Sequence, residues 1–138
     1  MFRRVFPLAA AFALYMSAFA GAADNSPSTD LALVRTAIIG TWQSVDDPKF
    51  TREFLPDGSA AERYEGDTSA TTPGRWLVFL GSAPPRGLAG RTLQPKVIYL
   101  ELDQNGDQLL FGLAGLSRSD LKMVYLERGN LLSFTRLK

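Results

Sequence analysis

Short runs rich in β-branched and aromatic residues, divided by polar turn residues, make up most of the chain after residue 38. This pattern is typical of a sheet sandwich or a barrel. No long helical pattern separates the runs, so we expect antiparallel connections between neighbouring strands. The turn residues divide the chain into eight predicted strands, over residues 39–45, 49–55, 59–65, 74–80, 95–102, 108–114, 120–127 and 130–137.

A short helix is predicted before the first strand, over residues 30–38. Leu31, Val34 and Ile38 lie on one stripe of this helix, and Ser28 or Thr29 can cap its N-terminus. The predicted fold class is all-β, an antiparallel up-and-down barrel of about eight strands preceded by this helix. We prefer the barrel because closure removes the exposed strand edges.

Three connections have the composition of tight hairpins, and two are longer. The hairpin sequences are Pro56-Asp57-Gly58, Asn105-Gly106 and Arg128-Gly129-Asn130. The longer gaps are residues 66–73 and residues 81–94, and the second is rich in Gly and Pro. In a small barrel, we expect loops of this length at the ends of the strands.

Charge determines the register of the first hairpin. A two-residue turn would place Glu53 opposite Glu62, and Arg52 opposite Arg63. A three-residue turn, with Gly58 left-handed in a bulge, instead places Arg52 opposite Glu62. Opposite charges across a strand pair stabilise it by about 0.2–1 kcal/mol, whereas like charges destabilise it. We therefore predict the three-residue turn.

That register places the candidate ligand site on one face of the hairpin. Phe50 then faces Tyr64 and Phe54 faces Ala60, which makes this face the more apolar one. The alternative interpretation of the charge pair on this face is a rim salt bridge of little energetic value. An arginine is well suited to hold a carboxylate with two hydrogen bonds. The predicted ligand-binding residues are Arg52, Glu62, Tyr64, Phe50 and Phe54.

Residues 1–22 have the pattern of a cleaved secretory signal peptide. Arg3 and Arg4 precede an apolar run over residues 5–19, and small residues follow at a spacing suited to signal peptidase. The run is short for a membrane span, and a retained single-span anchor is the alternative. We expect a periplasmic or secreted protein with no transmembrane anchor, a polar linker and helix over residues 23–38, and one barrel domain over residues 39–138.

Charge and composition exclude several classes of function. Without Arg3 and Arg4, the 15 basic residues become 13 against 14 acidic ones, a net charge of −1. A near-neutral domain with scattered charges has no electrostatic footprint for nucleic acid or anionic membranes. The chain has no cysteine, so burial alone must hold its core together.

The sequence predicts no catalytic residue, no metal site and no cofactor. It contains no histidine, which removes the common nucleophile systems and the usual zinc ligand sets. Residues 115–119 lack the second glycine of a nucleophile elbow, and residues 103–107 match a hairpin turn better than a calcium loop. We therefore expect a protein that is not an enzyme, with a carboxylate-based glycosidase as the remaining enzymatic alternative.

Several motifs occur in an order that resembles a known family. Gly40-Thr41-Trp42 opens the first strand, Gly74-Arg75-Trp76 starts a later one, and the last strand contains Thr135-Arg136. With the hairpin over residues 54–59, this order resembles the lipocalin-like (calycin) domains of exported bacterial proteins. The resemblance implies that Arg136 lies across Trp42 at the closed end of an up-and-down barrel, as a structural pair.

Two functions follow from this interpretation. The first is a non-enzymatic exported binding protein for a small apolar or amphipathic molecule in the barrel mouth. The inward aromatic residues would contact the apolar part, and Arg52 would hold an acidic head. The alternative is a solid barrel that acts through its loops as an interaction module or inhibitor for a protein partner in the cell envelope.

Overall fold

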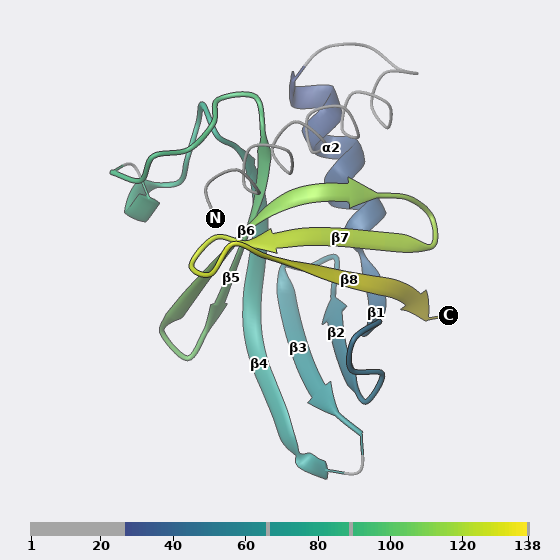
Figure 1. The fold of residues 1–138 in the computed structure, drawn as a ribbon. Helices are drawn as coiled ribbons and strands as arrows, with labels where there is room; N and C mark the ends of the chain where they lie inside the picture. The colour runs from purple at the N-terminus through teal and green to yellow at the C-terminus, as the bar shows by residue number, and fades with distance from the viewer. Residues whose placement is uncertain (1–26, 66, 89, 138) are drawn as a thin grey trace.

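Eight antiparallel strands pair in sequence order, and the last strand returns to the first to close a barrel (Figure 1). The computed structural model describes residues 27–65, 67–88 and 90–137, and the predicted signal peptide lies outside these ranges. The predicted fold class, an antiparallel barrel after a short helix, is confirmed. The elements are α2 (Pro27–Ile38), β1 (Gly40–Ser44), β2 (Phe50–Phe54), β3 (Ser59–Tyr64), β4 (Asp67–Leu80), the 3-10 helix η1 (Arg86–Leu88), β5 (Ile98–Gln104), β6 (Asp107–Leu116), β7 (Asp120–Tyr125) and β8 (Asn130–Leu137).

The up-and-down order gives the barrel two different ends. The β2–β3, β4–β5 and β6–β7 connections lie at the end where α2 enters β1, which we call the closed end. Val34 and Ile38 of α2 are fully buried and belong to the main core at that end. The β1–β2, β3–β4, β5–β6 and β7–β8 connections surround the opposite end, which we call the mouth.

The register predicted for the first hairpin is confirmed. Arg52 lies opposite Glu62, and Phe50 lies opposite Tyr64. Gly58 has a φ of 92°, and its amide donates a 3.1 Å hydrogen bond to the carbonyl oxygen of Leu55. The positive φ is the left-handed conformation that closes a three-residue turn, and it favours glycine. Charge pairing across the two strands therefore correctly identified the turn.

The predicted gap over residues 66–73 is wrong, because β4 already begins at Asp67. Pro73 indicated a break, yet it pairs with Ala61 of β3 inside the strand. The amide of Trp76 donates to Gly58 on the β3 side, so the nitrogen of Pro73 points the other way. Pairing with β5 begins only at Arg75, so Pro73 faces a side of β4 where no donor is needed. The other predicted boundaries are within three residues of those observed.

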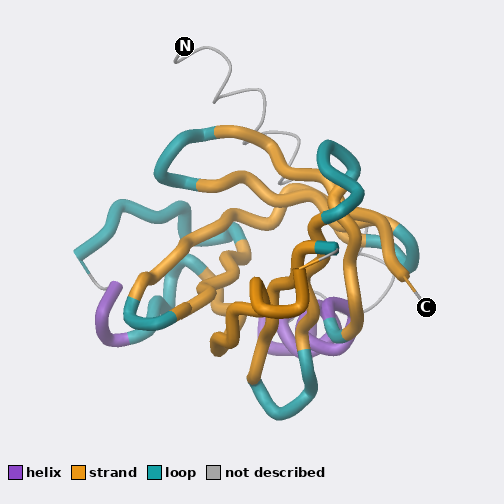
Figure 2. The backbone as a smooth tube through the Cα atoms, turned by 90° about the horizontal axis from the view of Figure 1, so that it is seen from below, coloured by secondary structure: helices purple, strands orange, loops and turns teal. Residues whose placement is uncertain are grey.

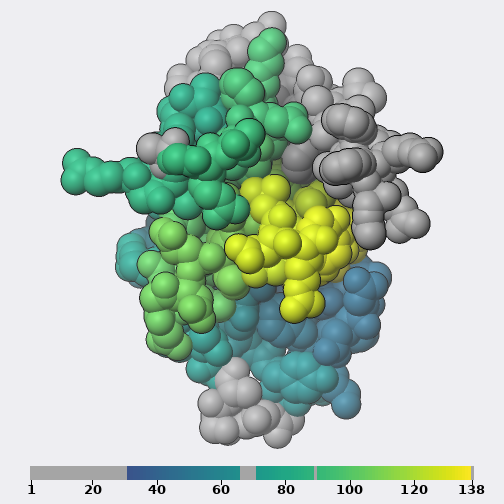
Figure 3. All heavy atoms as spheres, turned by 60° about the vertical axis from the view of Figure 1, so that its left-hand side comes forward, coloured from purple at the N-terminus to yellow at the C-terminus, as the bar shows by residue number. Residues whose placement is uncertain are grey.

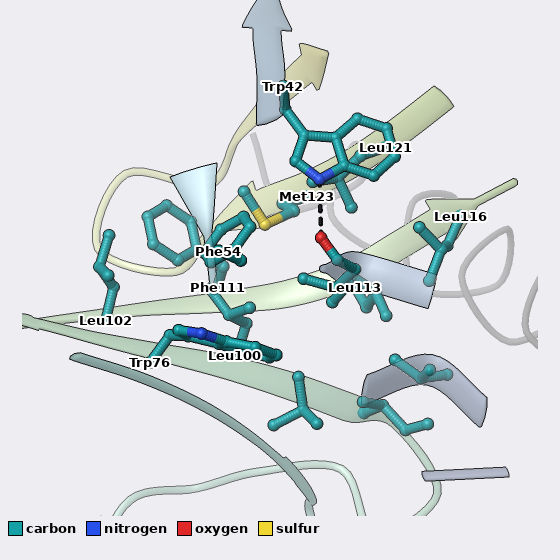
Figure 4. Close-up of a cluster of buried hydrophobic side chains, with 14 of the residues drawn as sticks. Trp42, Phe54, Trp76, Leu100, Leu102, Phe111, Leu113, Leu116, Leu121 and Met123 are labelled. Atoms are coloured by element: carbon teal, nitrogen blue, oxygen red, sulfur yellow. Dashed lines mark hydrogen bonds between the residues drawn. The ribbon is translucent and has the colours of Figure 1, made fainter. Parts of the chain in front are cut away.

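Side chains fill the barrel between the closed end and its middle (Figure 4). The Phe54 and Trp76 rings pack edge to face with their centroids 5.3 Å apart. Large residues that are fully buried complete this core, namely Trp42, Phe111, Leu100, Leu102, Leu113, Leu116, Leu121 and Met123. This part of the barrel is a packed core of buried side chains.

A second, smaller core lies outside the barrel, under the long β4–β5 loop. Leu88 and Val97 of this loop are buried against Phe79 and Tyr99 on the outer face of the strands. The Tyr99 hydroxyl accepts a 2.9 Å hydrogen bond from the Gln94 amide, and burial raises the pKa of Tyr99. Figure 2 shows the loop with η1 standing outside the strands, and Figure 3 shows it as a green ridge at the upper left. The loop begins at the closed end and folds back over the outer wall.

Replacing Gly81 by alanine is expected to destabilise the protein by about 1–3 kcal/mol. A Cβ at this position would lie 1.9 Å from the carbonyl oxygen of Gln94, so the loop would have to move off the outer core. Chemical denaturation followed by tryptophan fluorescence measures the change. Gly90→Ala is the matched control in the same loop, because nothing lies within 4 Å of a Cβ there. Equal stabilities of the two variants would contradict this packing.

Candidate ligand site at the barrel mouth

Arg136 and Trp42 form a contact that joins the ends of the domain. The Arg136 guanidinium carbon lies 4.2 Å from the centroid of the Trp42 ring. Its Nη1 and Nη2 donate to the carbonyl oxygens of Ile39 and Ala37, at 2.8 and 2.5 Å, and its Nε donates to that of Arg118 at 2.7 Å. The structure thus brings together the pair that the resemblance implied, and Arg136 also bonds three backbone carbonyl groups.

Arg52 carries a positive charge into the interior on the mouth side of this core. It lies on β2 next to Trp42 of β1, with its side chain pointing inward and only 6% of the residue exposed. Its Nε donates a 2.7 Å hydrogen bond to Oε2 of Glu62, and Nη2 forms an ion pair with the same oxygen. One carboxylate oxygen of Glu62 therefore interacts with two of the three guanidinium nitrogens of Arg52.

The third nitrogen, Nη1, is buried and has no hydrogen-bond partner among the described residues. The guanidinium lies 5.2–5.5 Å from the ring centroids of Phe50, Phe111 and Phe134, so aromatic faces surround it. Burial lowers the pKa of Arg52, and the charge and hydrogen bond of Glu62 oppose this shift. An arginine stays protonated in proteins, so the site holds a charged donor that still lacks an acceptor.

A depression of about 270 Å³ opens above Arg52 at the mouth. Phe111 and Tyr125 stack obliquely in its wall, with ring centroids 5.4 Å apart. Arg128, in the β7–β8 turn, adds a second positive charge at the rim. The complete lining consists of Arg52, Leu109, Phe111, Tyr125, Arg128, Asn130 and Leu132. Such a surface can take an apolar group and an acidic or polar group at once.

Only part of the predicted site comes together here. Of the five predicted residues, Arg52 alone lines the depression, and Glu62 and Phe50 contact the Arg52 side chain. Phe54 is fully buried against Trp76 in the closed half. Tyr64 is 40% exposed, and its hydroxyl lies 3.5 Å from Oδ1 of Asp47 in the β1–β2 loop. Residues two apart on a strand share a face but lie about 6–7 Å apart along it. The prediction placed these residues on the correct face of the β2–β3 hairpin but did not account for their different positions along the barrel axis.

The walls of the depression come from β6, β7 and β8, which the sequence-based site did not include. Leu109 and Leu132 fit the inward positions of predicted strands, but nothing in the pattern showed that they lie across the barrel from Arg52. Arg128 and Asn130 appeared only as hairpin residues. Barrel closure, which brings the last strands round to the first two, is the missing information.

Comparison of the chain with known protein families, with curated proteins and with solved structures gives no match. Within residues 27–65, 67–88 and 90–137, no helix is long and apolar enough to cross a membrane. The same part of the chain has no group of three or more His, Cys, Asp or Glu side chains that could hold a metal ion.

Replacing Arg52 alone by methionine is expected to cost about 3 kcal/mol of stability, because it leaves the largely buried Glu62 carboxylate without a counterion. Replacing both Arg52 and Glu62 by methionine should cost less than the single change, since no buried charge is then left unpaired. Urea denaturation of the two variants measures the difference.

The outer face of the same two strands supplies the control. Arg63 and Glu53 form a 2.9 Å ion pair there, with their side chains 50% and 26% exposed. Arg63→Met should change stability by less than about 1 kcal/mol. A loss as large as that of Arg52→Met would show that burial does not distinguish the two pairs.

Proposed function

We propose that this protein is an exported, non-enzymatic, lipocalin-like binding protein that holds a small amphipathic molecule in the mouth of its barrel. The observation that carries the proposal is the buried Nη1 of Arg52, which has no acceptor among the described residues and belongs to a side chain that lines the mouth depression. A buried charged donor without a partner costs free energy, and a ligand oxygen would remove that cost.

The remaining lining defines the class of ligand. Leu109, Phe111 and Leu132 offer apolar surface, while Arg128 reinforces the positive charge of Arg52. An acidic head on an apolar body satisfies both kinds of surface. The volume of about 270 Å³ is near the lower end of ligand pockets, so a compact ligand fits better than a long chain.

Two observations support the lipocalin-like assignment and the export. The Gly40-Thr41-Trp42 motif opens a closed eight-stranded barrel, and Arg136 from the last strand stacks on its tryptophan. The basic, apolar and small-residue segments of residues 1–22 support secretion or a periplasmic location. No cofactor or catalytic group enters this proposal.

One observation favours the alternative function, a solid barrel that binds an envelope protein through its loops. The closed half is packed with buried hydrophobic side chains, and the β4–β5 loop is anchored on its own outer core. Arg86 and Arg91 of this loop are exposed and free to contact a partner. This alternative requires no uptake of a small molecule at the mouth.

Native mass spectrometry of the protein with octanoate tests the proposal. The wild-type chain should retain one octanoate, and octylamine should not bind, because its ammonium group would meet two guanidinium groups. The double variant Arg52→Met, Glu62→Met should lose octanoate binding. The double variant of the outer-face ion pair, Glu53→Met, Arg63→Met, should keep octanoate binding. Failure of the wild-type chain to bind octanoate and a panel of other compact amphiphiles would overturn the proposal in favour of the solid barrel.

Export is tested by the intact mass of the protein recovered from the periplasmic or extracellular fraction. A processed chain should begin at Gly21 or Ala23, after one of the two small-residue cleavage sites. Recovery of the full-length chain from the membrane fraction would instead identify a retained anchor.

A further inference from the structure

A second depression, of about 370 Å³, lies between α2, the β2–β3 turn and the outer face of β4 and β5. It shares no lining residue with the mouth depression. Leu77 and Glu101 are opposite each other in its floor, and Arg75 is opposite Asp103 beside them. These side chains lie on the face of the sheet away from the barrel core, so this cleft is on the outside of the barrel, where the core residue Trp76 also lines it.

Glu101 is the unusual group in this cleft. Only 8% of the residue is exposed, and its Oε2 accepts a 2.6 Å hydrogen bond from Nε2 of Gln108. Within the described part of the chain, no basic group lies within 4 Å of its carboxylate. A carboxylate buried to this degree is normally paired with a cation, and a neutral amide compensates only part of its lost hydration. Asp103, two residues along the same strand, adds a second negative charge.

Two guanidinium groups line the cleft, one from α2 and one from β4. Arg35 of α2 lies 4.9 Å from the centroid of the Trp76 ring. Nη2 of Arg75 donates a 3.3 Å hydrogen bond to the carbonyl oxygen of Asp57 in the β2–β3 turn. Neither arginine forms an ion pair with a described residue. The cleft therefore presents charges of both signs, because the carboxylates of Asp57, Glu101 and Asp103 line it together with these two guanidinium groups. Arg75 is close enough to Asp57 to interact with it electrostatically.

The side chain of Leu77 is 40% exposed in the floor of this cleft. It offers an apolar surface next to Glu101. A ligand with charge of only one sign would meet like charges in the cleft, whereas a ligand with both signs can satisfy the two sets.

We propose that this cleft binds a small zwitterion of the amino-acid type with an apolar side chain. Its ammonium group pairs with Glu101 and Asp103, its carboxylate with Arg35 and Arg75, and its side chain lies on Leu77. The volume of about 370 Å³ lies within the range of small-molecule sites. This site does not depend on the function proposed for the mouth.

The two tryptophan indole N–H signals in a ¹H–¹⁵N NMR spectrum test the proposal. Trp76 lines the cleft and donates its indole N–H to Leu55 O at 2.9 Å, while the Trp42 indole donates to Ile38 O at 2.8 Å in the closed end. L-leucine should shift the Trp76 signal saturably and leave that of Trp42 in place. 3-Methylbutylamine and 4-methylpentanoate, which each lack one charge, should bind at least about tenfold more weakly.

Glu101→Gln keeps the size of the side chain and removes its charge, so it should weaken leucine binding at least about tenfold. Glu127→Gln, an exposed carboxylate in the β7–β8 turn, is the matched control and should bind as the wild type does. The double variant Arg52→Met, Glu62→Met should also bind leucine normally, which separates this test from the octanoate test of the mouth. No Trp76 shift at millimolar leucine, a shift unchanged by Glu101→Gln, or equal binding of the amine alone would each overturn the proposal.

Discussion

The stacking of Arg136 on Trp42 is the interaction on which the arrangement of the domain depends. The last carbonyl groups of a helix have no partner within it. Here the Trp42 indole N–H donates a hydrogen bond to the carbonyl oxygen of Ile38, and the Arg136 guanidinium donates to those of Ala37 and Ile39. A cation at this position is also favoured by the helix dipole. A Cβ at Gly40 would lie 2.4 Å from Nη1 of Arg136, so the glycine before the tryptophan makes room for the stack.

Depth along the barrel divides this molecule into a region that holds the fold and a region that can hold a ligand. At the level of Phe54 and Trp76 the interior is closed by rings and aliphatic chains. One step toward the mouth, Arg52 replaces an apolar residue and the packing opens into a depression. The ion pair with Glu62 compensates the cost of burying the Arg52 charge inside the barrel. It leaves the Nη1 donor of Arg52 without a hydrogen-bond partner among the described residues. The same strand therefore supplies both core and site.

Much of this fold could be predicted from the sequence, because its hairpins are local. The turn at Gly58 and the register of β2 on β3 followed from charges a few residues apart. The length of β4 could not be predicted, since Pro73 is tolerated only because of where β5 begins pairing. The walls of the mouth and the outer cleft were missed for a related reason. Both join residues from strands or helices that are distant in sequence, and side-chain periodicity carries no information about such neighbours.

The pairing of β8 with β1 also constrains the order in which the chain can fold. Arg136 and the carbonyl of Ile39 are 97 residues apart, so the contact closes a loop that spans nearly the whole domain. Contacts between such distant segments form slowly, because the entropy of loop closure is lost before they are made. The strand that carries Arg136 is also the last of the eight barrel strands to be synthesised. Until it arrives, one edge of β1 is unpaired and the carbonyl groups of Ala37 and Ile39 lack the hydrogen bonds from Arg136, so the nascent chain cannot complete its barrel early.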